Sequence, residues 1–343
     1  MEKALSPARL VGRIAVGLAI LLGVIVCCSL VGAERISLGE VFAANDGADV
    51  NPDFEIFFRV RIPRIFLAGI VGCALACSGV VLQGLLRNPL ADPYILGISS
   101  GSGLGAIIAV ISGVNWTLWG RSPIAVFAFA GAMGTVWLVW FIGRMTGRSH
   151  VSHLLLAGVV VNAFFSAMIM FLTSIAKSSQ VHATIFWLMG NIVEEGGLTL
   201  WVSGGVVLCG VLVLYFVSPQ LNAMSFSEGD ARSMGINVGR TRGVAFGVTA
   251  LITAVAVSLS GLVGFAGLIV PHGVRLVFGP DHRQLIPLAS IAGAIFLIVA
   301  DTIARIVVAP AQLPVGVVTA IVGGPFFLVL LMRYSRRVDW LVR

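Results

Sequence analysis

The chain has 343 residues, of which 58% are hydrophobic and 11% are charged. A soluble domain carries about 25% charged residues, so this composition excludes a soluble globular protein and indicates an integral membrane protein. The net charge of +7 does not require nucleic acid as a partner, because Lys and Arg collect on the cytoplasmic side of membrane proteins.

The first apolar run, residues 10–33, has the basic flank and small-residue end of a signal peptide. It is long enough to cross a bilayer, so we expect it to be the first membrane span. Nine further apolar runs predict spans at 64–84, 93–112, 122–143, 153–173, 197–217, 242–260, 263–278, 284–308 and 315–333.

These runs predict an all-α integral membrane protein of about ten transmembrane helices, organised as a single transmembrane domain over residues 1–343. Nine or eleven helices stay possible, because the seventh and eighth runs merge and only Gly261 and Gly264 offer a turn between them. With the N-terminus inside, most of the 22 Lys and Arg residues fall inside. Both termini are therefore expected in the cytoplasm.

Four arginines oppose this charge rule, because they fall at the outer ends of the second and ninth spans. They are Arg59, Arg61, Arg64 and Arg305. Either they serve a function at the outer surface, or they extend to the membrane interface or pair with Asp53, Glu55 or Asp301.

Two polar segments interrupt the spans on the cytoplasmic side. The first, "RNPLADPYILGISSGSGLG" at 87–105, contains Pro89 and Pro93, which end helices, and then a stretch almost without side chains. Irregular backbone at this depth survives where it is buried in protein or lines water, so it either borders a solute route or forms an ordinary loop. The second, 218–242, predicts a short helix capped by Ser225 or Ser227.

No motif for catalysis or for a cofactor is present. The five cysteines and five histidines lack metal-ligand spacing, and no GxxxxGK[ST] phosphate loop occurs, so ATP hydrolysis would require another chain. Asn162 is one of few polar residues inside a span, and it either faces a central path or bonds a neighbouring helix.

Several long motifs, in order, resemble those of the FecCD-type permeases, which are the membrane subunits of ABC importers for iron(III)-siderophores, haem and cobalamin. The resemblance covers about residue 55 to the end. It rests on "RIPR" (61–64), "SGVVLQGLLRNPLADPYILGISSG" (78–101), "SHLLLAGVVVN" (152–162), "WLMGN" (187–191), "LNAMSFSEGDARSMGINVGRTR" (221–242), "GLVGFAGLIVPHGVRLVFGPDHRQLIPLAS" (261–290) and "LPVGVVTAIVGGPFFLVLL" (313–331).

The resemblance implies a type II ABC importer permease fold with ten helices, working as a homodimer in a bacterial or archaeal cytoplasmic membrane. It also implies two cytoplasmic ATP-binding subunits and an extracytoplasmic solute-binding protein as partners. No metal, cofactor or nucleic acid is expected, and the chain is not expected to be an enzyme.

Roles for individual residues also come from the resemblance. It implies that Arg61, Arg64 and Arg305 dock the binding protein, although Gln312 stands where relatives often carry Glu. The other roles are a cytoplasmic gate at Asn88, Leu90, Val151 and Ser152, and contact with the ATPase through Glu228, Arg232 and Gly235 in the coupling loop, 218–242.

The preferred cargo is an iron(III) complex, either a siderophore or haem. This preference rests on how common such systems are in the family. The alternatives are a cobalamin importer of the same family and an ion-coupled secondary transporter. The second alternative requires ionisable groups near the middle of the membrane, and the sequence shows no cluster of acids there.

Overall fold

A computed structural model of the chain describes residues 6–41, 51–114, 122–145, 151–192 and 197–339. Every regular element in these ranges is helical. The helices are α1 (Pro7–Leu30), α2 (Leu38–Val41), α3 (Pro52–Glu55), η1 (Ile56–Arg61), α4 (Ile62–Leu85), η2 (Pro93–Leu96), α5 (Ile98–Ser112), α6 (Pro123–Met145), α7 (Val151–Ile175), α8 (Ser178–Leu188), α9 (Gly197–Phe216), α10 (Ser218–Phe226), α11 (Glu228–Ser233), α12 (Val238–Ser260), α13 (Ala266–Phe278), α14 (His282–Ile306) and α15 (Val315–Asp339).

Within the described part of the chain, ten of these helices match the ten predicted spans. Seven are long and apolar enough to cross a membrane, and three, in α5, α13 and α15, are shorter apolar helices. The predicted break between the seventh and eighth spans is confirmed, because α12 ends at Gly261 with φ +63°. The third span begins later than predicted, because the turn Pro93–Leu96 and Gly97, with φ +76°, come before α5.

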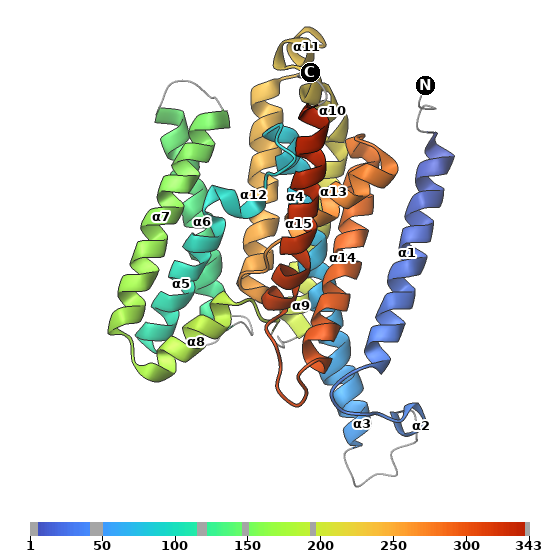
Figure 1. The fold of residues 1–343 in the computed structure, drawn as a ribbon, viewed down its shortest axis with the longest axis vertical. Coiled ribbons are helices and arrows are strands. Elements are labelled where there is room, and N and C mark those ends of the chain that lie inside the picture. Colours follow the sequence, from blue (N-terminus) through green and yellow to red (C-terminus); the bar gives the residue numbers. More distant parts are fainter. Residues whose placement is uncertain (1–5, 42–50, 115–121, 146–150, 193–196, 340–343) are drawn as a thin grey trace.

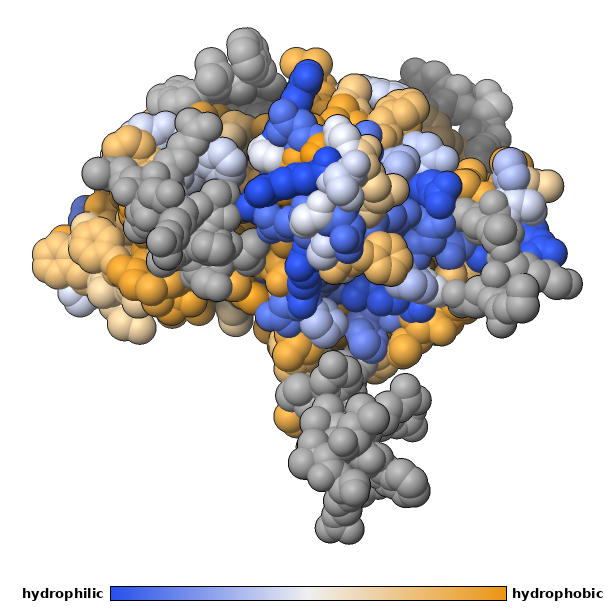
Figure 2. Space-filling view, turned by 90° about the horizontal axis from the view of Figure 1, so that it is seen from above, coloured by the Kyte–Doolittle hydropathy of each residue, from blue (hydrophilic) through white to orange (hydrophobic). Residues whose placement is uncertain are grey.

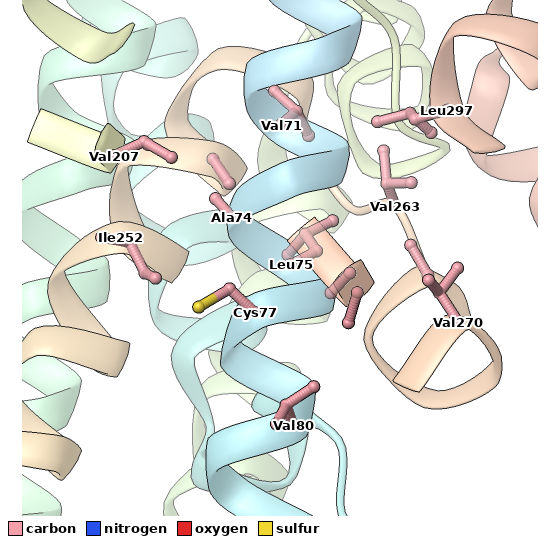
Figure 3. Close-up of a cluster of buried hydrophobic side chains, with 14 of the residues drawn as sticks. Val71, Ala74, Leu75, Cys77, Val80, Val207, Ile252, Val263, Val270 and Leu297 are labelled. Atoms are coloured by element: carbon pink, nitrogen blue, oxygen red, sulfur yellow. The ribbon is translucent and has the colours of Figure 1, made fainter. Parts of the chain in front are cut away.

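Helix α4 is the centre of the packing. It lies among α9, α12, α13 and α14, and its buried side chains meet theirs in the core (Figure 3). Gly79 allows α13 to come close, because a Cβ there would stand 1.8 Å from the carbonyl oxygen of Gly267. Small residues at such contacts bring helix backbones together in lipid.

Helices α5, α6, α7 and α8 form a second group beside the α4 group, and α1 lies at the opposite rim (Figure 1). The beginning of α1, the end of α15 and the pair α10–α11 share one end of the molecule. This is the end that the positive-inside rule assigns to the cytoplasm. Helices α3 and α8 lie at the outer end.

Candidate functional site

A cavity of about 580 Å³ lies between α5, α7 and α8. No charged side chain is among the residues that line it, which are mostly apolar or carry hydroxyl groups. Asn162 is the amide in this lining. The lining residues are Ser99, Ser100, Asn162, Ser166, Ile169, Met170, Thr173, Ser174, Thr184, Ile185, Leu188 and Leu262.

The walls of this cavity are held in place by hydrogen bonds from side chains to backbone. Ser100 Oγ donates to the carbonyl oxygen of Gly97 at 3.0 Å, at the start of α5. Gln180 Nε2 donates to the carbonyl oxygens of Val110 and Ile111 at 3.3 Å, which fixes α8 across the outer end of α5. The cavity therefore presents a preformed, uncharged surface of apolar side chains interspersed with hydroxyl groups.

The segment 87–97 places Leu90 against other helices at the cytoplasmic end. Leu90 shares a small cavity with Leu268 and His272 of α13 and Phe326 of α15. Asn88 shapes the turn, because its Oδ1 accepts the backbone N–H of Leu90 at 2.9 Å. Val151 begins α7, and Ser152 follows it, but the side chains of both lie outside the described residues.

Tyr94 ties this segment to the turn between α12 and α13, and the sequence interpretation missed it. Its hydroxyl donates to the carbonyl oxygen of Val263 and accepts the N–H of the same residue, both at 2.9 Å. Its partner is a backbone group, which the residue pattern does not name. Asp92 Oδ1 accepts the N–H of Tyr94 at 2.8 Å, and burial raises the pKa of Asp92 to about 6 although that bond lowers it.

The coupling loop folds as two short helices rather than one. Ser227 caps α11 by accepting the N–H of Asp230 at 2.9 Å, so of the two predicted caps Ser227 is the correct one. Glu228 pairs with Arg232 at 3.7 Å and with the buried Arg242 at the start of α12. Gly235, with φ +80°, turns the chain towards α12.

Two hydrogen-bonded links connect the coupling loop to the membrane helices. Arg87 Nη2, after the end of α4, donates to the carbonyl oxygen of Met224 in α10 at 2.7 Å. Asn222 of α10 donates to Asp281 at 2.6 Å and accepts the N–H of His282 at 2.8 Å, at the start of α14. Motion of α10 would therefore be passed directly to α4 and α14.

The outer arginines proposed for docking are buried in this conformation. Arg64 donates from Nε and Nη2 to the carboxylate of Asp301 at 3.0–3.2 Å, and Arg305 donates to the same carboxylate at 3.1 Å. Arg61 donates to the backbone carbonyls of Ser29 and Glu34. The exposed fractions are 3% for Arg61, 6% for Arg64 and 7% for Arg305.

Gln312 takes part in this cluster. Arg64 Nη1 donates to Gln312 Oε1 at 3.1 Å, so an amide oxygen accepts where a carboxylate could. Arg59 precedes these arginines in the chain and pairs with Glu55. Its side chain is 75% exposed. The structure thus favours pairing with Asp301 for two of the three arginines, and docking by the three stays a prediction.

Comparison with known proteins agrees with this arrangement. The profile of the FecCD transport family matches residues 19–333. The chain belongs to the FecCD transport family. FecCD relatives include the hemin transport system permease HmuU of Yersinia pestis, 39% identical with 82% of this chain and 84% of that protein covered. The cobalamin import system permease BtuC of Halobacterium salinarum is 41% identical, with 79% and 72% covered.

A solved structure of the same kind supports the fold. It is a metal-chelate type ABC transporter in an inward-facing conformation, with a TM-score of 0.80 and 29% identity over 96% of this chain and all of that one. The predicted membership and fold class are therefore confirmed. This FecCD chain is a multi-pass membrane permease of an ABC transporter and not its ATPase.

Proposed function

We propose that the chain is the permease of an ATP-driven importer for an iron(III) complex, a siderophore or haem, in a bacterial or archaeal cytoplasmic membrane. The observation that carries the proposal is the uncharged cavity along α5, α7 and α8. A wall without fixed charge offers no ion pair to a small charged substrate. It suits a large complex whose selection has already been made by an extracytoplasmic binding protein.

The open side of this cavity supports a homodimer. Met170 of α7 and Ile185 of α8 line the cavity and are 73% and 47% exposed, and α7 lies on the outside of the helix bundle (Figure 1). A second copy of the chain against this face would close the cavity and leave a path along the interface, with Asn162 facing it from each copy.

The links of α10 indicate how ATP would drive the path. Two ATPase subunits would bind the coupling loops through Glu228, Arg232 and the turn at Gly235. Their closure would shift α10, and Arg87 would carry this shift to the segment that holds Asn88 and Leu90. The gate formed by these residues with Val151 and Ser152 would then open or close the cytoplasmic end.

The arrangement argues against an ion-coupled secondary transporter. That class requires ionisable groups at a site near the middle of the membrane, whereas no acid or base is among the residues lining the cavity. Asp301 is held between two arginines near the outer end. Among the described residues, no group of three His, Cys, Asp or Glu could hold a metal ion.

The test is uptake by cells that contain the permease, the ATPase and the binding protein. Labelled ferric siderophores, haem and cobalamin are offered in parallel, with a catalytically inactive ATPase as the matched control. ATPase-dependent uptake of an iron complex is expected. If cobalamin alone is taken up, the cargo is cobalamin and not an iron complex. If uptake does not depend on the ATPase but stops when the ion gradient is removed, the chain is not an ATP-driven importer.

A further inference from the structure

A second cavity is not part of this path. It has a volume of about 900 Å³ and lies at the cytoplasmic end, between the first turns of α1, the end of α4, α10, and the connection from α13 to α14. Figure 2 looks onto this end of the molecule and shows hydrophilic residues gathered over its centre. Five arginines line the cavity: Arg9, Arg13, Arg87, Arg275 and Arg283.

Carboxylates do not balance these arginines. Asp281 is the one acid in the lining, and it pairs with Arg283 at 3.3 Å. Arg13 donates to the neutral amide oxygen of Gln284, and Arg87 donates to a backbone carbonyl. Four of the five arginines thus have no acidic partner among the described residues, and the cavity is strongly positive.

One arginine is already oriented by its surroundings. The guanidinium of Arg13 stands over the ring of Phe278, 5.2 Å from its centre, a distance at which a cation and an aromatic face attract. A planar guanidinium held in this way offers two parallel N–H donors, the geometry that binds phosphate oxygens well.

The rim of the cavity indicates where its ligand comes from. Val11 of α1 is 66% exposed, and Leu276 and Val277 at the end of α13 are 72% and 73% exposed. In a membrane protein such apolar side chains face acyl chains. The arginines therefore lie next to lipid, at the depth of the cytoplasmic headgroups.

We propose that this cavity binds the phosphate headgroup of an anionic phospholipid from the cytoplasmic leaflet. Basic pockets between transmembrane helices on the cytoplasmic side recognise such headgroups. Bound there, the phosphate would bridge α1 to α13, next to the link between α10 and α14. The proposal depends only on the orientation of the chain in the membrane. It can therefore be tested separately from the proposed cargo of the importer.

The test uses the purified, delipidated full-length chain and a pair of matched double variants. Arg9→Gln with Arg275→Gln removes two charges from the cavity, and neither arginine has an acidic partner to leave unpaired. Arg35→Gln with Arg59→Gln removes two exposed charges at the outer end. Retention of phosphatidylglycerol is measured by native mass spectrometry, with phosphatidylcholine as the neutral lipid.

The wild type and the outer variant are expected to retain phosphatidylglycerol and to release phosphatidylcholine. The cavity variant is expected to bind phosphatidylglycerol about thirtyfold more weakly, since each arginine near an anionic lipid contributes roughly a factor of five. Equal retention by both variants, or equal retention of both lipids, would overturn the proposal.

Two further arms distinguish other anions. Glycerol phosphate and inorganic phosphate are added as competitors, and displacement of the lipid at equal concentration would show a site for soluble phosphate instead. If the cavity variant lost affinity for the ATPase subunit while retaining phosphatidylglycerol normally, the cavity would be a contact for an acidic protein segment, and the lipid proposal would fail.

Discussion

The two ends of the molecule hold their charged residues in opposite ways. At the outer end, Asp301 is 1% exposed and lies between Arg64 and Arg305, each of which donates to its carboxylate. At the cytoplasmic end, the half-buried Asp92 accepts a backbone N–H and has no basic partner among the described residues. Four arginines in the nearby cavity have no acidic partner among the described residues.

Ion pairs therefore join the helices at the outer end, whereas several charges at the cytoplasmic end have no partner of opposite sign. Arg64 belongs to α4, and Asp301 and Arg305 belong to α14, so their pairing joins the two helices near the outer surface. Charges without a partner of opposite sign respond to protonation or to a bound ion. At the cytoplasmic end Asp92 and four cavity arginines are of this kind, although Glu228 with Arg242 and Asp281 with Arg283 are paired there.

Removing the shared carboxylate should have the largest effect. Asp301→Asn leaves Arg64 and Arg305 buried without a negative charge, and breaking a buried pair costs about 3–5 kcal/mol. We expect most of the folded, monodisperse protein to be lost, as measured by size-exclusion chromatography and thermal unfolding in detergent. Glu55→Gln is the control, because its partner Arg59 is exposed and the loss should stay below about 1 kcal/mol. Equal effects would show that burial does not distinguish the two pairs.

Asp92 should make the stability of the folded protein depend on pH near neutrality. Burial raises its pKa to about 6 from 3.8, so the folded state binds the proton more tightly than the unfolded state does. The stability that protonation contributes is therefore present at about pH 4 and is lost as the pH rises through about 6, by about 3 kcal/mol. In Asp92→Asn this dependence should disappear, as measured by thermal unfolding at pH 5 and pH 7.5.

Asp281 supplies a control of opposite sign. Burial raises its pKa, but the N–H of Arg283, the amide of Asn222 and the charge of Arg283 together hold it below the ordinary value. Its contribution to stability is present at neutral pH and is lost as the pH falls below about 4. If Asp92→Asn and Asp281→Asn changed the pH profile in the same direction, the contrast between partnered and unpartnered acids would be wrong.

Much of this architecture was predictable from the sequence, because lipid demands long apolar helices and the runs show them directly. Local rules also limited the break between the seventh and eighth spans to Gly261 or Gly264 and the cap to Ser225 or Ser227, and the structure selects Gly261 and Ser227. The pairing of Arg64 with Asp301 was one of several open alternatives, since 237 positions separate the two residues. The partner of each arginine depends on tertiary packing, which local patterns do not encode.

The contacts of Tyr94 and Arg87 escaped prediction for a related reason. Each bonds to a backbone group far along the chain, Val263 and Met224 respectively. Backbone groups carry no sequence signal, so nothing in the residue pattern names the partner. Such links become visible once the packing of the helices is known.

Cutting the Arg87 link should affect transport more than assembly. Arg87→Ala removes a charged donor from the carbonyl oxygen of Met224, a bond of about 1.5–3 kcal/mol. We expect transport per ATP hydrolysed to fall about tenfold or more in proteoliposomes while the ATPase remains bound. Arg9→Ala is the control, an exposed arginine at the same end and outside the coupling loop. Loss of ATPase binding in Arg87→Ala would mean that the residue holds the complex together rather than passing motion.

The smallest effect concerns docking at the outer end, where one exposed charge stands beside the buried ones. Arg59→Glu should weaken binding of the extracytoplasmic protein by about 0.2–1 kcal/mol, the range of exposed pairs, and the difference should vanish in about 1 M salt because exposed charges are screened. Reversing Arg61, Arg64 and Arg305 together should instead abolish folding, since Asp301 would then face acids. Surface plasmon resonance on the folded fraction of each variant measures docking. If the triple variant folds and loses only docking, the buried arginines contact the binding protein. The cluster of Arg64, Asp301 and Arg305 would then itself be part of the docking interface.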